Sequence, residues 1–203
     1  MNTNQTVPFL KGHEVYLRGL TEEDLEGPMR HWSNDREVTR FMYRGHRPST
    51  PERRRQEHQK RLDPSNDDVE LAVIESETDR HIGITGLHSF NWLARSAEFR
   101  ILIGEKETWG QGYGTEACQL MVIYGFEIFN LHKVWLGVNE ANKAAVRSYE
   151  KAGFVEEGTL RDEVYRNSQY YDAIRMSMLR DEYEQQRETW AIADLIDKQF
   201  PRQ

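Results

Sequence analysis

The 203-residue sequence contains one cysteine, Cys118, so it can form neither an internal disulfide nor a cysteine zinc site. No apolar run approaches the ~20 residues that a membrane-spanning helix needs. The polar residues 1–8 lack the apolar segment of a signal peptide. We therefore expect a cytoplasmic protein that has no membrane partner and binds no metal.

Basic residues are in the minority: the 27 lysines and arginines are outnumbered by 34 acids, which gives a net charge of −7. Nucleic-acid backbones attract cationic proteins, so we expect no nucleic-acid partner. The length is that of one domain, and 37% of the residues are hydrophobic, which is enough for a buried core. Basic side chains nevertheless gather at Arg40, Arg44, Arg47, Arg53, Arg54, Arg55, Lys60 and Arg61, against only Glu52 and Glu57 in that stretch.

Hydrophobic periodicity predicts a mixed α/β fold. We expect a strand at 12–20 and helices at 21–32 and 51–62, the first capped by Thr21 with Asp24 at the capping-box position. Three strands joined by short turns should form an antiparallel meander, at residues 69–74, 82–90 and 97–103. The remaining expected elements are a helix through 117–128, strands at 133–138, 154–166 and 170–179, and helices at 141–151 and 181–200.

A glycine-rich loop, Trp109-Gly-Gln-Gly-Tyr-Gly-Thr115, lies between a predicted strand and a predicted helix. Glycines let the backbone turn its N–H groups inward, and the helix adds its free N–H groups and the positive end of its dipole. Such a loop can hold a phosphate or pyrophosphate, although a plain strand-to-helix turn is the alternative. No Gly-Lys-Ser/Thr follows, and the antiparallel meander disfavours the dinucleotide-binding βαβ unit.

A second group of residues lies on the predicted helix at 141–151. Asn142, Ala145 and Tyr149 share one helix face. The amide can bond peptide-like groups of a ligand, the small alanine allows close approach, and the phenol lies further along. A packed tyrosine with a satisfied hydroxyl is the alternative. We expect structural roles for Glu116, an acid at a helix N-terminus, and for Cys118.

The two groups together resemble the GNAT N-acetyltransferases, and within them the RimJ/RimL-like branch; the C-terminal half is similar to bacterial spermidine acetyltransferases. The family motif Gln/Arg-x-x-Gly-x-Gly/Ala matches at 109–114, with Trp109 in the first position. The family's Asn-x-x-Ala and Tyr-x-x-x-Gly-Phe elements match at 142–145 and 149–154. The likeness extends from residue 13 to about residue 183.

The resemblance implies the GNAT fold, a central mixed twisted sheet of about seven strands flanked by helices. It implies a GNAT acetyltransferase domain at 1–183, followed by a helical extension at 184–203. The apolar side chains of that extension, among them Trp190, Ile192 and Phe200, can cover either the same domain or a second copy. Because homodimers are common in the family, a homodimer is expected.

The resemblance also implies an acyltransferase that moves acetyl from acetyl-CoA to a primary amine by direct attack in a ternary complex. Tyr149 would protonate the departing thiolate. Pantetheine would pair with the strand at 101–103, where a backbone N–H would stabilise the oxyanion, and the amides of 111–114 would hold the pyrophosphate. The residues expected to bind acetyl-CoA are Ile101, Leu102, Ile103, Trp109, Gly110, Gln111, Gly112, Tyr113, Gly114, Thr115, Asn142 and Ala145.

The general base is less well specified. An alkyl amine, with a pKa of about 10.4, must lose a proton before it attacks, and a carboxylate or histidine can take it. Glu98 is the first candidate and His88 the second. The alternative for Glu98 is an ion pair with Arg100 or Arg95.

The acceptor is expected to be a small molecule such as an aminosugar, an amino acid or a polyamine. The basic cluster between residues 40 and 61 argues against spermidine and suits an acceptor with negative charge, unless it is only a solvated helix face. Two other functions remain open: acetylation of protein N-termini, as in ribosomal-protein acetyltransferases, and a non-catalytic acetyl-CoA sensor.

Overall fold

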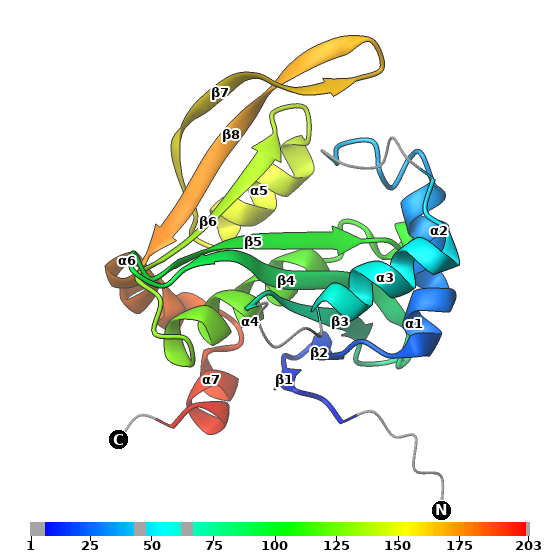
Figure 1. Ribbon diagram of the computed structural model, residues 1–203. Coiled ribbons are helices and arrows are strands. Elements are labelled where there is room, and N and C mark those ends of the chain that lie inside the picture. Colours follow the sequence, from blue (N-terminus) through cyan, green and yellow to red (C-terminus); the bar gives the residue numbers. More distant parts are fainter. Residues whose placement is uncertain (1–6, 43–47, 62–66, 202–203) are drawn as a thin grey trace, which may run out of the picture.

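An eight-stranded sheet runs through the protein in the order β1-β2-β3-β4-β5-β6-β8-β7, with helices on both faces (Figure 1). The structure is a computed structural model that describes residues 7–42, 48–61 and 67–201. The strands are β1 (Leu10–Lys11), β2 (Val15–Gly19), β3 (Val69–Glu75), β4 (His81–Asn91), β5 (Ser96–Ile103), β6 (Lys133–Asn139), β7 (Val155–Arg166) and β8 (Gln169–Leu179).

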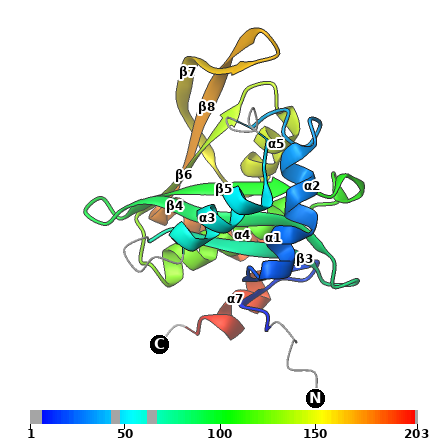
Figure 2. The same ribbon diagram turned by 45° about the vertical axis from the view of Figure 1, so that its right-hand side comes forward.

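Two groups of helices cover the sheet, seen from a second direction in Figure 2. On one face, α4 (Tyr113–Glu127) and α5 (Lys143–Lys151) pack on the main core; α1 (Glu22–Glu26) and α2 (Pro28–Asn34) pack on the other. The remaining helices are α3 (Pro51–Arg61), α6 (Arg180–Gln186) and α7 (Ala193–Gln199), with short 3-10 turns η1 (Lys106–Thr108) and η2 (Arg187–Thr189). The predicted mixed sheet flanked by helices is thus confirmed.

Side chains of β5 alternate between the two cores, as a strand's period of two requires. Phe99, Ile101 and Ile103 pack in the main core beneath α4, whereas Leu102 packs with Trp32 and Val38 in a second, smaller core. Strand β5 is therefore packed against a core on each of its two faces.

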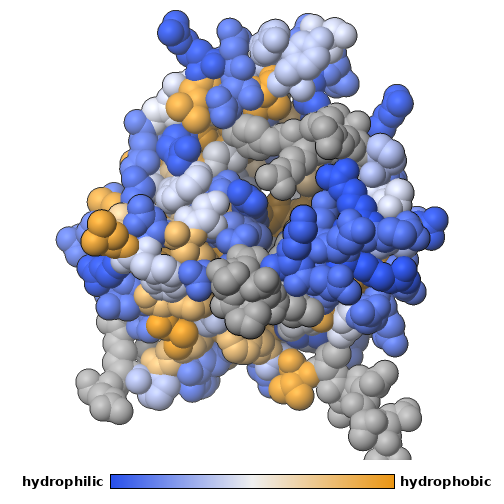
Figure 3. Space-filling view, in the orientation of Figure 1, coloured by the Kyte–Doolittle hydropathy of each residue, from blue (hydrophilic) through white to orange (hydrophobic). Residues whose placement is uncertain are grey.

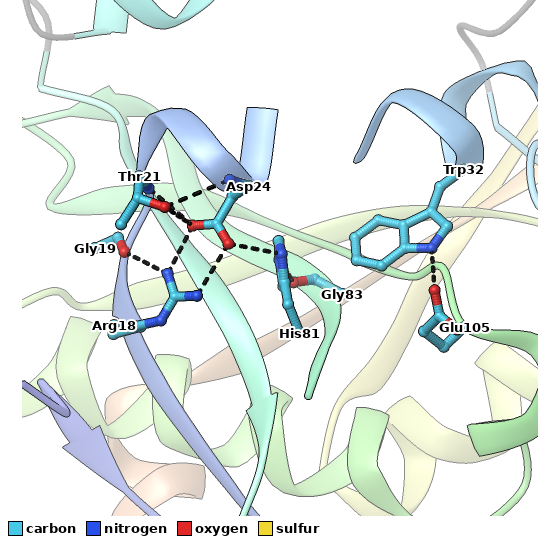
Figure 4. A network of polar contacts seen from close by, with 8 residues as sticks. All are labelled: Arg18, Gly19, Thr21, Asp24, Trp32, His81, Gly83 and Glu105. Carbon is cyan, nitrogen blue, oxygen red and sulfur yellow. Dashed lines mark hydrogen bonds and ion pairs between the residues drawn. The ribbon is translucent and has the colours of Figure 1, made fainter. Parts of the chain in front are cut away.

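A buried polar network ties α1 to the sheet (Figure 4). Arg18 on β2 binds Asp24 through Nη1–Oδ2 and Nη2–Oδ1 contacts of 2.6 and 2.9 Å. Nδ1 of His81 on β4 lies 2.9 Å from the other face of the same carboxylate. Thr21 and Asp24 also form the predicted capping box. Asp24 is only 4% exposed, so it holds two strands and a helix in one place.

The charge of Asp24 is maintained despite its burial. Burial alone would raise its pKa, but the hydrogen bonds from Arg18, His81 and Thr21 outweigh burial and hold the pKa of Asp24 well below its usual range. Its stabilising contribution is therefore complete above the unfolded-state pKa of about 4 and is lost as the pH falls below that value.

Three expected elements differ from the structure. The two-residue strand β1 adds an eighth strand beside β2. The helix expected at 21–32 is divided into α1 and α2 at Gly27–Pro28, because Pro28 has no N–H to continue α1. The single helix expected at 181–200 forms α6, η2 and α7 instead, because Arg187 turns inward to bind Glu127 with an N–O distance of 2.9 Å.

The C-terminal residues pack on their own domain. Trp190 and Ile192 are buried in the main core. The side-chain amide of Gln199 on α7 accepts from the N–H of Lys11 at 2.8 Å and donates to its carbonyl at 2.7 Å. This pair covers the edge strand β1 in the way that another strand would. Within the part of the chain that the structure describes, no helix is long and apolar enough to cross a membrane.

We expect Asp24→Asn to destabilise the protein by about 3–5 kcal/mol, because it leaves Arg18 buried without its anion. Denaturant unfolding at pH 7 measures this, with Glu23→Gln, an exposed acid on the same helix, as the control. The difference between Asp24→Asn and the native protein should shrink as the pH is lowered below about 4. An equal loss in both variants would contradict a special role for Asp24.

Candidate active site

The central feature of the site is an opening between β5 and β6, the one parallel pair in the described sheet. The two strands pair only over Ser96–Glu98 and Lys133–Trp135, although β5 continues to Ile103 and β6 to Asn139. Beyond this point they diverge (Figure 1). The space-filling view shows a recess with an apolar floor in this part of the molecule, beside the strongly hydrophilic surface of α3 (Figure 3).

Backbone polar groups of β5 face the opening at every second residue. The N–H of Gly104 donates to Ile82 at 2.8 Å, so the even-numbered residues of β5 point toward β4 and the odd-numbered ones toward β6. Ile101 and Ile103 thus present backbone groups to the opening, as expected for pairing with a ligand. Leu102 presents its backbone to β4 and contributes its side chain to the second core.

The glycine-rich loop ends β5 and begins α4. Gly110 and Gly112 adopt φ angles of +79° and +95°, which favour glycine. Gly112 is the N-cap of α4, and its carbonyl accepts from Thr115 and Glu116. The amides of residues 111–114 donate to no other described residue, so four N–H groups remain at the positive end of the helix.

Two hydrogen bonds hold the loop against its surroundings. The indole N–H of Trp109 donates to the carbonyl of Ile103 at 2.9 Å, which fastens the loop to the end of β5. The hydroxyls of Thr115 and Ser148 lie 2.7 Å apart and join α4 to α5. Trp109 and Thr115, predicted to contact a ligand, thus also fix the geometry of the cradle.

The side chains of Tyr113 and Glu116 have structural partners. The hydroxyl of Tyr113 donates to Glu75 at 2.9 Å. A carboxylate oxygen of Glu116 accepts from the backbone N–H groups of Glu14 and Val15, both at 2.9 Å. Glu116 therefore organises the start of β2, and its role is structural as expected.

Helix α5 carries the second group of predicted residues along the opening. Asn142 is its N-cap and accepts from the N–H of Ala145 at 3.3 Å. The ring of Tyr149 packs edge-on against Phe99, with 6.1 Å between ring centroids, and Phe99 is the first residue of β5 beyond the parallel pairing. Tyr149 therefore lies where the opening begins.

The hydroxyl of Tyr149 is protonated at neutral pH. Burial, and to a smaller extent the nearby Cys118, raise the pKa of Tyr149 far above its usual value. No hydrogen bond joins this hydroxyl to any other described residue, so its proton is available to a ligand. This is the arrangement that a general acid requires.

The two candidate bases lie directly opposite each other, as Cα partners on β4 and β5. Glu98 accepts from Nη2 of Arg100 at 2.6 Å, so the ion pair weighed from the sequence forms along the strand rather than across it, and its side chain is 19% exposed. His88 is buried, at 4% exposure, and its Nδ1 lies 3.2 Å from Asp68. Because its side chain is more exposed to solvent, Glu98 is the better candidate for the general base.

The basic cluster does not form a single surface. Arg54 is buried and donates to Met29 and Ser33, while Arg53 and Arg55 pair with Glu57 and Glu26. Arg44 and Arg47 lie outside the described residues, and the side chain of Arg61 does as well. Most of the described α3 arginines thus hold the helix in place.

One contact that crosses the mouth of the opening has no signal in the sequence. Nη2 of Arg166, at the end of β7, donates to the carbonyl of Thr39 at 2.5 Å. These residues are 127 positions apart, and no local pattern connects them. Among the described residues, no group of three or more histidines, cysteines or acids is placed to hold a metal.

Comparison with known proteins identifies the family. The acetyltransferase (GNAT) domain model matches residues 14–155, and the chain belongs to this family. It is 40% identical to spermidine N(1)-acetyltransferase of Vibrio cholerae over 111 residues, which cover 55% of this chain and 64% of that protein. The Escherichia coli K12 enzyme of the same name is 39% identical over 111 residues, 55% of this chain and 59% of that one. The chain therefore matches less than two thirds of the length of these relatives.

Similarity in fold to the Vibrio cholerae enzyme covers more of this chain than the sequence match to it does. The crystal structure of the Vibrio cholerae spermidine N-acetyltransferase in complex with CoA and spermine superimposes with a TM-score of 0.77 at 31% identity. The match covers 84% of this chain and 98% of that one. The observed sheet is therefore the GNAT fold.

We expect the single thiol to be inert in the native protein. Cys118 is fully buried in α4, and burial raises its pKa, so little thiolate is present for reaction. A chromogenic disulfide reagent should react with no thiol at pH 8 and with one per chain in concentrated guanidinium chloride. Rapid reaction of the folded protein would show that the thiol of Cys118 is accessible to the reagent. An inert thiol also leaves the background low in assays of released CoA.

Proposed function

We propose that this protein is an acetyl-CoA-dependent N-acetyltransferase that acetylates the primary amine of a small molecule. The observation that carries the proposal is the unpaired edge of β5, which opens between the free amides of residues 111–114 and the hydroxyl of Tyr149. The likeness to an N-acetyltransferase solved with CoA and spermine supports it.

The site suits the chemical parts of acetyl-CoA. Four amides at a helix N-terminus match a pyrophosphate. The backbone groups of Ile101 and Ile103 match the amides of pantetheine, as an added strand would. An N–H of this edge is also placed to stabilise the oxyanion that forms when an amine attacks the thioester. Asn142 and Ala145 border the same path on α5.

The proposed reaction needs one base and one acid. Glu98 takes a proton from the ammonium group, directly or through water, since it is the more exposed of the two candidates. The neutral amine attacks the thioester carbon, the carbon–sulfur bond breaks, and Tyr149 donates its proton to the departing sulfur, whose thiol has a pKa of about 8.5. The second proton that the nitrogen loses in becoming an amide returns to the Tyr149 oxygen. Both substrates are held together, so proximity contributes much of the rate. The buried Cys118 takes no part, and no covalent enzyme intermediate forms.

Tyr149→Phe should lower kcat by about 100-fold or more, the usual contribution of a general acid, while acetyl-CoA still binds. The matched control is Tyr124→Phe, a buried tyrosine of α4. Because the pKa of Tyr149 is raised, deprotonation of Tyr149 should not reduce kcat of the native enzyme at any pH below about 10. Acceptor-dependent release of CoA measures both. A non-catalytic sensor would bind acetyl-CoA in both variants and release CoA in neither.

Gly112→Ala should weaken acetyl-CoA binding by about tenfold, because a side chain disfavours the left-handed backbone by about 1–2 kcal/mol. Gly114→Ala is the control, since Gly114 has no positive φ and its added methyl group would lie 3.6 Å from Ile103, an ordinary contact. Calorimetric titration with acetyl-CoA compares the two. Equal losses would mean that bulk in the loop, rather than its conformation, limits binding.

The organisation of the protein is part of the same proposal. We propose a catalytic GNAT domain at 1–183 with an extension at 184–203 that packs on it. The single reduced cysteine is consistent with the cytoplasm as the compartment. Exposed apolar side chains at Phe9 and Ile128 support a homodimer, which sedimentation equilibrium would test.

A further inference from the structure

Two arginines converge on one short segment at the mouth of the opening. Arg166, at the end of β7, donates to the carbonyl of Thr39. Arg40, the next residue, lies against Trp109, with 4.8 Å between its guanidinium carbon and the ring centroid. Trp109 is in turn bonded to the end of β5. Arg40 therefore lies near the end of β5, and Arg166 is bonded to the residue before it.

The guanidinium group of Arg166 is incompletely satisfied. Its Nε is buried and has no hydrogen-bond partner among the described residues. A buried donor of a charged group that lacks a partner is costly, so such groups are normally completed by water, an ion or a ligand. The one hydrogen bond from the Arg166 side chain to a described residue, the carbonyl of Thr39, fixes its position without neutralising its charge.

Arg40 is held flat by aromatic rings. Its guanidinium carbon lies 4.9 Å from the ring centroid of Phe41 as well as 4.8 Å from that of Trp109. Contact with aromatic faces leaves the edge of a guanidinium group, where the N–H groups point, open for bonding. The carbonyl of Glu37 accepts from Nη1 at 2.8 Å, the carboxylate of Glu37 lies 3.9 Å from the same nitrogen, and the side chain of Arg40 remains 40% exposed. Such a preorganised edge suits carboxylate or phosphate oxygens.

The neighbouring carboxylates are already engaged. Lys106 lies 3.0 Å from Asp35 and 3.1 Å from Glu37, and Arg100 holds Glu98. A polycationic acceptor would therefore find Asp35 and Glu37 already paired with Lys106.

Building on the proposed function, we propose that Arg40 and Arg166 form an anion-binding subsite, and that the acceptor is a small primary amine carrying a carboxylate or phosphate group. The anion is bound at the mouth by the two guanidinium groups. The amine then reaches into the opening toward Glu98 and Tyr149. The acceptor thus differs in charge from the polyamine named for the Vibrio cholerae relative.

The test compares amines that differ only in the anionic group: phosphoethanolamine with ethanolamine, glucosamine 6-phosphate with glucosamine, and histidine with histamine. Spermidine is assayed beside them. For each pair, kcat/KM is measured with the native enzyme and with Arg166→Gln, Arg40→Gln and Arg36→Gln. Arg36 is an exposed arginine of the same segment and serves as the matched control.

The native enzyme should prefer the anionic member of at least one pair by about tenfold or more, the order expected for a charge-assisted hydrogen bond. Arg166→Gln and Arg40→Gln should each reduce that preference toward one, without raising the KM for acetyl-CoA, and Arg36→Gln should leave it unchanged. Preference for spermidine or for the neutral members would overturn the subsite. So would a raised KM for acetyl-CoA with an unchanged preference, because the arginines would then serve the pyrophosphate of the co-substrate.

A binding measurement separates this inference from the proposed function. Phosphoethanolamine, glucosamine 6-phosphate and histidine are titrated by calorimetry into the CoA-saturated protein and into its Arg166→Gln variant. Binding of one of them that is lost in the variant, with no acetylation of any amine, would refute the transferase and keep the subsite. Acetylation of neutral amines with no arginine-dependent binding would refute the subsite and keep the transferase.

Discussion

The site depends on the early end of the pairing between β5 and β6. Each strand has an extended antiparallel partner on its outer side: β5 pairs with β4 from Ser96 to Ile103, and β6 pairs with β8 over its whole length. Between them only three residue pairs form. The sheet therefore behaves as two stiff halves joined at one end, and each half follows its own twist. The backbone groups left unpaired on β5 would be costly if buried, but a ligand that lies in the opening can satisfy them.

Hydrogen bonds and ion pairs on both faces of the sheet hold the opening in shape. Trp109 fastens the glycine-rich loop to the last residue of β5, and the hydroxyls of Thr115 and Ser148 join α4 to α5. On the other face, the Arg18–Asp24–His81 network fixes α1 to β2 and β4. Preorganised donors need no rearrangement when charge develops, which is why such rigidity favours catalysis. The same rigidity separates the structural acids, Asp24 and Glu116, from Glu98, the proposed general base.

Local signals in the sequence were sufficient for part of this arrangement. Glycine spacing predicted the cradle at 109–114, and helical periodicity put Asn142, Ala145 and Tyr149 on one face. An ion pair of Glu98 with Arg100 was foreseen as an alternative, although it forms along β5 and not across two strands. What could not be predicted depends on tertiary contacts: the inward turn of Arg187 and the reach of Arg166 to Thr39.

The division between shared and individual parts of the fold explains how relatives of this similarity can differ in substrate. The opening and the cradle offer backbone N–H groups, and the fold that carries them matches that of the Vibrio cholerae enzyme at 31% identity. The mouth is formed by side chains on the segment after α2 and on the tip of the β7–β8 hairpin, where packing constrains the sequence least. Function resides in such sites rather than in the fold that carries them. Similarity measured over the sheet therefore identifies the family, whereas in our proposal the charge of Arg40 and Arg166 selects the acceptor.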